Sequence, residues 1–130
     1  MTSYFYVIGP VGADPVFDEK RNILIEVGSD HEVGPLFPLD RHSAFSPEEA
    51  VRDMRGAEIV IADLSHERPS CYYELGLAEA AGVSITLIAE AGTRIHQVGN
   101  PRSVRFYADL ADYRRMMNEI FTKCRRTAAG

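Results

Sequence analysis

The feature of this sequence that most constrains its fold is an alternation, repeated five times, of short apolar runs with longer amphipathic stretches. Nearly continuous apolar strands separated by amphipathic helices are typical of a parallel sheet that helices cover on both faces. We expect strands at residues 4–8, 34–39, 58–62, 83–89 and 103–107. We expect helices at residues 16–27, 47–56, 70–81 and 109–126.

This pattern predicts one α/β domain that spans residues 1–130. Because crossover connections between parallel strands are right-handed, we expect the strand order 2-1-3-4-5. That is the flavodoxin-like (Rossmann-like) arrangement, a three-layer sandwich built on a five-stranded parallel sheet. Ligands of such folds bind outside the carboxyl ends of the strands, where the strand order reverses. The site is therefore expected beside the ends of the first and third strands.

The composition argues against several classes of function. The chain has a net charge of -5, so it is a poor candidate for binding a nucleic-acid backbone, which requires clustered lysine and arginine. No apolar run approaches the roughly 18 residues of a membrane span, and the first residues lack the pattern of a signal peptide. We expect a cytoplasmic protein that binds neither membrane nor nucleic acid.

Metal chemistry is not expected either. Cys71 and Cys124 lie far apart in the sequence and form no metal-binding spacing, so reduced thiols are their simplest interpretation. His42 and His66 are expected in exposed loops, without a partner at ligand spacing. The sequence thus predicts no metal and no cofactor.

Polar and small residues follow three of the expected strands, at the edge where the site should lie. The first strand ends at Gly9 and Pro10, the second at Asp40, and the third at Asp63, with Ser65 close behind. The carboxyl ends of parallel strands meet at one edge of a sheet. These residues are therefore expected around one crevice.

The helix after the third strand adds Tyr73 and Glu74, so two carboxylates, Asp63 and Glu74, are expected to flank the crevice. Each residue also has an ordinary structural interpretation. Asp63 could cap its loop by accepting backbone N–H bonds, and Glu74 could be an acid favoured by the helix dipole. Tyr73 could be a packing residue, and Gly76 could simply allow close packing of the helix on the sheet.

Two stretches form a recognisable pattern: AEIVIADLS at residues 57–65, a buried strand that ends in an acid, and CYYELGLA at residues 71–78. Together they resemble the nucleoside 2-deoxyribosyltransferase superfamily, which includes nucleotide N-glycosidases. Gly82 and the following apolar strand complete the pattern, and Ile8-Gly9-Pro10 resembles the family's first loop. The resemblance implies an enzyme that cleaves the N-glycosidic bond of a nucleoside or nucleotide, as a hydrolase or a transferase.

In that family a glutamate attacks the anomeric carbon of the sugar, and the matching residue is Glu74. Breaking the bond develops positive charge on the sugar, which a carboxylate can stabilise or trap covalently. A helix N-terminus is expected to lower the pKa of Glu74 and keep it ionised. Asp63 is the expected second acid, by analogy with glycosidase carboxyl pairs about 5 Å apart. An aromatic residue at the mouth, Tyr6 or Tyr73, is expected to stack on the base or to orient Glu74.

The strand ends and the resemblance together give the remaining contacts. Further substrate contacts are expected at Gly9, Pro10, Asp40, Ser65 and Gly76. A 5′-phosphate would be contacted from the loop that contains Ser65, His66 and Arg68. The first loop, residues 9–14, lacks the run of Ser, Arg or Gly that phosphate-selective members have there.

A second resemblance uses the same glutamate. Residues 70–75, SCYYEL, are also similar to a region of TIR domains, some of which cleave NAD and act in bacterial stress or antiphage signalling. The two resemblances differ in substrate, a nucleoside or nucleotide in one and NAD in the other. A third interpretation is a pocket that senses a nucleotide without chemistry, because a fold alone does not confer activity. Relatives in both families often dimerise, so a homo-oligomer is expected.

Overall fold

The computed structural model describes residues 3–37, 45–96 and 98–129, with side chains as far as residue 124. Its centre is a five-stranded sheet in the order β2-β1-β3-β4-β5 with parallel neighbours, as the sequence predicts. The strands are β1 (Tyr4–Ile8), β2 (Gly34–Leu36), β3 (Ile59–Asp63), β4 (Ile85–Glu90) and β5 (Arg105–Tyr107). The helices are α1 (Phe17–Asp30), α3 (Pro47–Gly56), α4 (Pro69–Ala80) and α5 (Leu110–Ala129), with short 3-10 helices η1 (Ser65–Glu67) and η2 (Pro101–Ser103).

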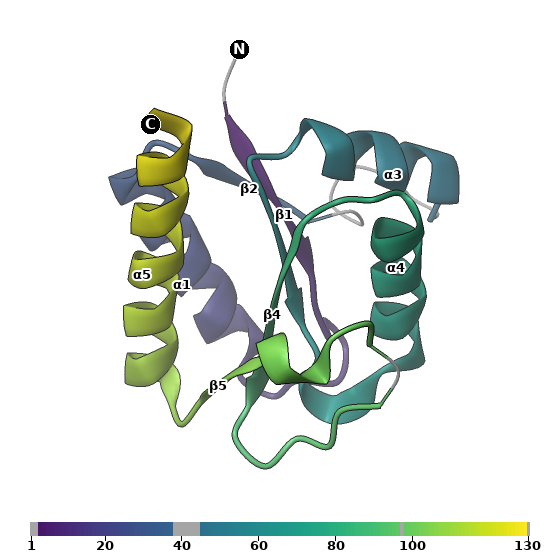
Figure 1. The fold of residues 1–130 in the computed structure, drawn as a ribbon. Coiled ribbons are helices and arrows are strands. Elements are labelled where there is room, and N and C mark those ends of the chain that lie inside the picture. The colour runs from purple at the N-terminus through teal and green to yellow at the C-terminus, as the bar shows by residue number, and fades with distance from the viewer. Residues whose placement is uncertain (1–2, 38–44, 97, 130) are drawn as a thin grey trace.

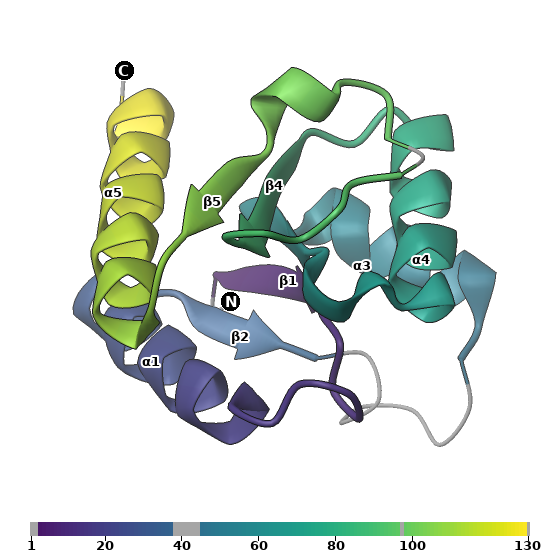
Figure 2. The ribbon, with the colours of Figure 1, turned by 90° about the horizontal axis from the view of Figure 1, so that it is seen from below.

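Helices cover both faces of the sheet and give the molecule three layers (Figures 1 and 2). Helices α1 and α5 pack on one face, and α3 and α4 pack on the other. Strand side chains alternate between the two faces. Phe5, Val7 and Ile61 therefore lie in the core under α1 and α5, whereas Tyr6 and Ala62 lie in the core under α3 and α4.

The start of α3 has a capping signal in its sequence. The Ser46 hydroxyl accepts a hydrogen bond from the backbone N–H of Glu49 (3.4 Å), and Pro47 occupies the first helical position. Both features favour helix initiation at this point.

Within the described residues, no helix combines the length and the apolar character needed to cross a membrane.

The end of α4 explains why β4 begins later than predicted. Gly82 has a φ of 74°, and its N–H donates to the carbonyl of Glu79, while the N–H of Val83 donates to the carbonyl of Ala78. These two bonds form a Schellman motif, which closes the helix. Because the motif uses Val83, β4 begins at Ile85 and not at residue 83 as predicted.

Gly28 in α1 packs directly against β1. A β-carbon there would lie 2.4 Å from the carbonyl oxygen of Val33 and 2.8 Å from Cε1 of Phe5. Gly28→Ala is expected to lower the free energy of unfolding by about 1–3 kcal/mol, because the helix must shift away from the sheet. In the control, Gly76→Ala in α4, the added carbon meets nothing within 4 Å. That change should raise the free energy of unfolding by about 0.5–1 kcal/mol. Urea denaturation measures both, and equal effects would contradict the packing.

Candidate active site

A cavity of about 360 Å³ opens at the carboxyl edge of the sheet, between the segments that follow β1 and β3. The strand order reverses at this point, and the volume is within the range of small-molecule sites. Its walls come from the loop after β1, the start of α1, the residues that flank segment 38–44, and the start of α4. The described lining residues are Val7, Gly9, Pro10, Val11, Gly12, Phe17, Arg21, Phe37, Phe45, Arg68, Ser70, Tyr73 and Glu74.

Glu74 lies in the second turn of α4 and lines the cavity with a partly buried side chain. Burial raises the pKa of its carboxyl group to about 7. The expectation that the helix N-terminus would lower this pKa is wrong. The influence of the helix dipole falls off within the first turn, and Glu74 is beyond that turn, where burial dominates. At neutral pH, Glu74 is therefore divided between the acid and the carboxylate.

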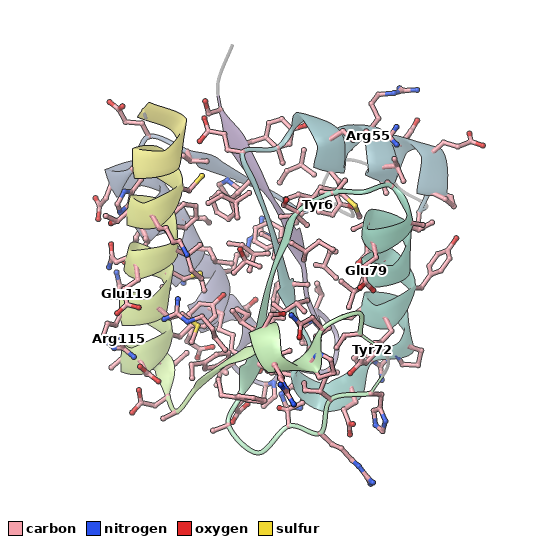
Figure 3. The ribbon with its side chains drawn as sticks, in the orientation of Figure 1. Tyr6, Arg55, Tyr72, Glu79, Arg115 and Glu119 are labelled. Atoms are coloured by element: carbon pink, nitrogen blue, oxygen red, sulfur yellow. The ribbon has the colours of Figure 1, made fainter. Side chains whose placement is uncertain are left out.

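Tyr6 on β1 is fully buried between the sheet and helices α3 and α4 (Figure 3). Among the described residues, its hydroxyl group has no hydrogen-bond partner. Burial, and next the charge of Glu74, raise the pKa of this hydroxyl well above its ordinary value. Tyr6 thus contributes a neutral O–H donor near Glu74. It does not present a ring at the mouth of the cavity, so stacking on a base does not fit its position.

Tyr73 occupies the mouth instead. Its side chain is 52% exposed, and its ring meets that of Phe45 edge-on with the centroids 5.5 Å apart. The neighbouring Tyr72 faces another surface, where its hydroxyl accepts a hydrogen bond from the backbone N–H of His96 (3.1 Å). Of the two adjacent tyrosines, one therefore packs under a loop and the other is available to a flat ligand.

Asp63 is not among the described residues that line the cavity. Its carboxylate accepts hydrogen bonds from the hydroxyls of Ser65 (2.6 Å) and Tyr107 (2.8 Å), and it lies 3.5 Å from the ammonium group of Lys20. Lys20 is on α1, and Tyr107 lies in the core under α1 and α5, whereas Glu74 is on α4 at the other face of the sheet. The structure therefore does not place the carboxylates of Asp63 and Glu74 on either side of one crevice, as was expected.

Lys20 is the centre of this buried network and is only 2% exposed. Its ammonium group pairs with Asp14 and Asp63 and donates a hydrogen bond to the hydroxyl of Tyr107 (2.6 Å). Burial raises the pKa of Asp14, but the hydrogen bond and the charge of Lys20 outweigh it and leave that pKa below its ordinary value. Because Asp14 ends the loop after β1, the network holds the loop that forms one wall of the cavity.

Only some of the other predicted site residues line the cavity. Gly9 and Pro10 line the cavity. Ser65 is fully buried in the network described above, away from the cavity. Gly76 is not among the described lining residues, and an added β-carbon there would meet nothing within 4 Å, so close packing does not require glycine. Asp40 lies outside the described residues.

The loop after β3 has an unusual backbone. His66 and Glu67 have φ angles of 65° and 48°, in the left-handed region that residues other than glycine rarely adopt. Histidine–carboxylate contacts hold both residues: His66 Nε2 lies 3.6 Å from Asp14 and 3.8 Å from Glu90, and Glu67 lies 2.5 Å from His96. Backbone strain of this kind is concentrated at functional sites.

Sequence reasoning missed Arg21, Phe37 and Phe45, all of which line the cavity. Arg21 follows Phe17 by one turn of α1, and its guanidinium group lies 4.3 Å from the ring centroid of Phe37. The spacing of Phe17 and Arg21 was the signal that could have placed Arg21 on the same helix face as Phe17, because residues four apart share one face of a helix. Phe37 and Phe45 gave no comparable signal, since their approach depends on tertiary structure.

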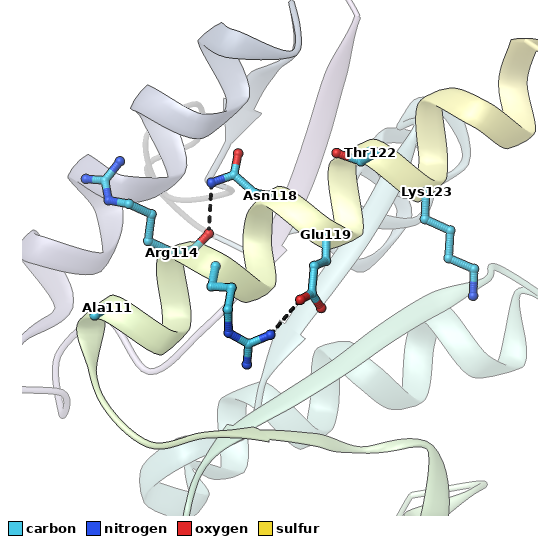
Figure 4. Close-up of a pocket in the computed structure, with 7 residues that line it drawn as sticks. Ala111, Arg114, Asn118, Glu119, Thr122 and Lys123 are labelled. Carbon is cyan, nitrogen blue, oxygen red and sulfur yellow. Dashed lines mark hydrogen bonds and ion pairs between the residues drawn. The ribbon is translucent and has the colours of Figure 1, made fainter.

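A wider and shallower hollow lies on the outer surface of α5, where charged side chains project (Figure 4). Its arginines are paired, Arg114 with Glu26 (2.6 Å) and Arg115 with Glu119 (2.5 Å). Exposed pairs of this type contribute little to stability and are common on helix surfaces. We interpret this hollow as an ion-paired helix surface.

Solved structures that are similar to this chain include two 2-deoxyribosyltransferases. A 2-deoxyribosyltransferase from Leishmania mexicana has a TM-score of 0.53 and 25% sequence identity, over 67% of this chain and 64% of that protein. A 2-deoxyribosyltransferase from the psychrotolerant bacterium Bacillus psychrosaccharolyticus has a TM-score of 0.62 and 13% identity, over 86% of this chain and 90% of that protein. The chain has a nucleoside 2-deoxyribosyltransferase-like fold. It spans less than two thirds of the length of the Leishmania protein.

These structures confirm the resemblance found in residues 57–65 and 71–78 at the level of the fold. No protein-family model and no curated protein matches the sequence. The TIR-like alternative is not tested by these comparisons.

Lys20→Met would remove the ammonium group that lies between two buried carboxylates, those of Asp14 and Asp63. We expect the free energy of unfolding to fall by about 3–5 kcal/mol at neutral pH. The control is Arg114→Met, which removes an exposed cation from its 2.6 Å pair with Glu26. That change should cost less than about 1 kcal/mol. Chemical denaturation measures both variants, and equal losses would show that the ammonium group does not compensate the buried acids.

Glu74→Gln is expected to make the protein more stable at alkaline pH. A carboxyl group with a pKa of about 7 when folded, against about 4.3 when unfolded, binds its proton more tightly in the folded state. Its contribution to stability is full below the unfolded pKa and is lost as the pH rises through about 7. At about pH 8 the variant should exceed the parent by about 3–4 kcal/mol, and below about pH 4 the difference should vanish.

The control for this measurement is Glu79→Gln, which removes the same formal charge from an exposed position on the same helix. Free energies of unfolding of the three proteins are compared across the pH range. Parallel profiles for the parent and Glu74→Gln would contradict the raised pKa.

Proposed function

We propose that this chain is an enzyme that breaks the N-glycosidic bond of a nucleoside or nucleotide, with Glu74 as the nucleophile. The supporting observation is a partly buried carboxyl group in a mainly apolar cavity, at the switch point of a 2-deoxyribosyltransferase-like fold. Such a cavity offers an apolar wall to a heteroaromatic base and a carboxylate to the sugar.

In the proposed reaction a carboxylate oxygen of Glu74 bonds to the anomeric carbon while the carbon–nitrogen bond breaks. The base leaves with the bonding electron pair and takes a proton from solvent. Water then attacks the same carbon, the bond to Glu74 breaks, and a proton is released. A second base in place of water gives transfer of the sugar. The apolar walls strengthen the attraction between the carboxylate and the positive charge on the sugar.

Tyr6 supports this role for Glu74. Its hydroxyl group is a neutral donor that no described residue uses. A hydrogen bond from this hydroxyl to Glu74 would favour the ionised carboxylate and hold one oxygen, leaving the other to face the sugar. We assign Tyr6 as a positioning residue and Tyr73 as the stacking surface for the base.

Asp63 has a structural task in this proposal. Both of its oxygens accept hydrogen bonds within the buried network. We therefore assign Asp63 to holding the cavity wall through Lys20, and not to proton transfer. Solvent at the exposed mouth beside Tyr73 supplies the proton that the leaving base requires.

A homo-oligomer and a cytoplasmic location stay predictions. Val11 and Tyr73 at the rim of the cavity are 50% and 52% exposed. A second copy of the chain that covered this rim would remove apolar surface from water. We assign any contact between copies to this rim.

The test is chromatographic detection of free base from ribonucleosides, 2′-deoxyribonucleosides, their 5′-monophosphates and NAD. Glu74→Gln should lower kcat for the accepted substrate by about a thousandfold or more, because the nucleophile is lost. In the parent, kcat/KM should rise as the pH increases through about 7, since burial raises the pKa of Glu74 in the free protein to that value and only the carboxylate attacks. Glu79→Gln should retain the parent activity.

Base release by Glu74→Gln at the parent rate would remove Glu74 from the mechanism. Nicotinamide release from NAD, with all other compounds intact, would favour the TIR-like alternative. A raised melting temperature with no turnover of any compound would favour a nucleotide sensor, because ligands that bind the native state alone stabilise it.

A further inference from the structure

Ser70 is a polar residue of the cavity that has no task in the proposed reaction. The hydroxyl groups of the described lining come from two residues of α4, Tyr73 at the mouth and Ser70 one turn before Glu74. Ser70 is exposed in the first turn of the helix, so its hydroxyl group is open to a ligand in the cavity. In a mainly apolar cavity, a polar group of this kind fixes the orientation of the ligand.

The hydroxyl group of Ser70 lies on the same wall as the carboxyl group of Glu74. The two residues are four apart on α4, so they share one helix face with their β-carbons about 5–6 Å apart. Helical side chains tilt toward the N-terminus of their helix, and the carboxyl group of Glu74 therefore leans toward the turn that contains Ser70. A sugar that meets Glu74 is thus within reach of Ser70 as well.

Glu74 does not use the hydroxyl group of Ser70. A hydroxyl group that donates to a carboxylate lowers the pKa of that carboxylate. Burial raises the pKa of Glu74 to about 7, and among the described residues no hydrogen bond opposes this rise. The O–H of Ser70 is therefore not donated to the carboxyl group.

Cys71 leaves the same O–H available. Burial raises the pKa of the Cys71 thiol to about 12, and a hydrogen bond with Ser70 opposes this rise. The thiol is therefore protonated at neutral pH, and it can donate to an oxygen lone pair of Ser70. A serine hydroxyl has one donor and two acceptor sites, so Ser70 retains its own proton for a ligand.

The stereochemistry of the proposed reaction decides which part of the sugar faces α4. A nucleophile that displaces the base attacks the anomeric carbon from the side opposite the base. In a β-nucleoside the 2′ and 3′ hydroxyl groups lie on that same side of the furanose ring, whereas the base and the 5′ carbon lie on the other. A sugar placed for attack by Glu74 therefore turns its 2′ and 3′ positions toward α4.

We propose that Ser70 donates a hydrogen bond to the 3′-oxygen of the sugar and makes the enzyme selective for substrates with a 3′-hydroxyl group. This inference rests on the proposed function and specifies how its site holds the sugar. The 2′ carbon is bonded to the anomeric carbon, so it lies against Glu74 itself. The 3′ carbon is one position further round the ring, which fits a group one helical turn away from the nucleophile.

The test compares four sugar forms of each substrate: ribo, 2′-deoxy, 3′-deoxy and 2′,3′-dideoxy. They carry adenine, guanine, cytosine or uracil and are used as nucleosides and as 5′-monophosphates. Values of kcat/KM come from chromatographic detection of the free base. Dissociation constants come from calorimetry with the Glu74→Gln protein, which keeps the shape of the side chain but lacks the nucleophile. The two measurements separate binding of the sugar from cleavage.

Ser70→Ala should lower kcat/KM about tenfold for accepted compounds with a 3′-hydroxyl group, and less than about twofold for their 3′-deoxy forms, since one hydrogen bond is lost. Intrinsic reactivity differs among the sugars, but it is the same in every protein and cancels when the two losses are compared. Ser70→Thr, which retains a hydroxyl group, should keep the parent preference. The control is Ser29→Ala, an exposed position on α1, which should leave all values unchanged. Circular dichroism of each variant verifies the fold.

Equal losses for 3′-hydroxyl and 3′-deoxy compounds in Ser70→Ala would overturn the contact and leave N-glycosidic cleavage standing. A loss that follows the 2′-hydroxyl group instead would overturn it in the same way. Base release from no compound would overturn the proposed function, and the dissociation constants would then decide the contact. A tenfold loss of affinity confined to 3′-hydroxyl compounds supports the contact, whereas equal losses, or no binding of any compound, overturn it.

Discussion

The buried ammonium group of Lys20 is the interaction on which the carboxyl edge of this protein depends. It lies between the carboxylates of Asp14, in the loop after β1, and Asp63, at the end of β3. A buried ion pair adds little net stability compared with apolar packing, but loss of one partner leaves an uncompensated charge in the interior. The loop after β1 is thereby confined to the arrangement in which Gly9 and Pro10 line the cavity. The geometry of the candidate site thus depends on charged side chains that are not among its described lining residues.

The fold could be predicted because its signals are local and agree with one another. Apolar runs at strand spacing, the cap at Ser46 and the stop at Gly82 each specify one element, and together they fix the order β2-β1-β3-β4-β5. The same reasoning, taken further, would have placed Asp63. Residues 59, 61 and 63 of β3 share one face, and residues 60 and 62 share the face covered by α4. An acid at position 63 therefore faces away from an acid on α4.

The site was harder to predict because its properties come from contacts distant in sequence. Lys20 and Arg21 are adjacent cations on an amphipathic helix, and lysine is rarely buried, so the local pattern cannot distinguish them. Lys20 is buried through contacts with residues 43 and 87 positions away. Position in the helix likewise suggested a lowered pKa for Glu74, whereas burial by surrounding elements raises it. Sequence identified Glu74 and Asp63 as candidate groups, and tertiary packing decided what each of them does.

The charges of the cavity are best understood together. Apolar walls leave Glu74 with a pKa of about 7, so part of the protein at neutral pH holds the acid, which cannot attack. A negative ligand in the same cavity would raise this pKa further, because like charges disfavour ionisation. A hydrogen bond from the hydroxyl of Tyr6, as proposed above, would favour the carboxylate from the protein side.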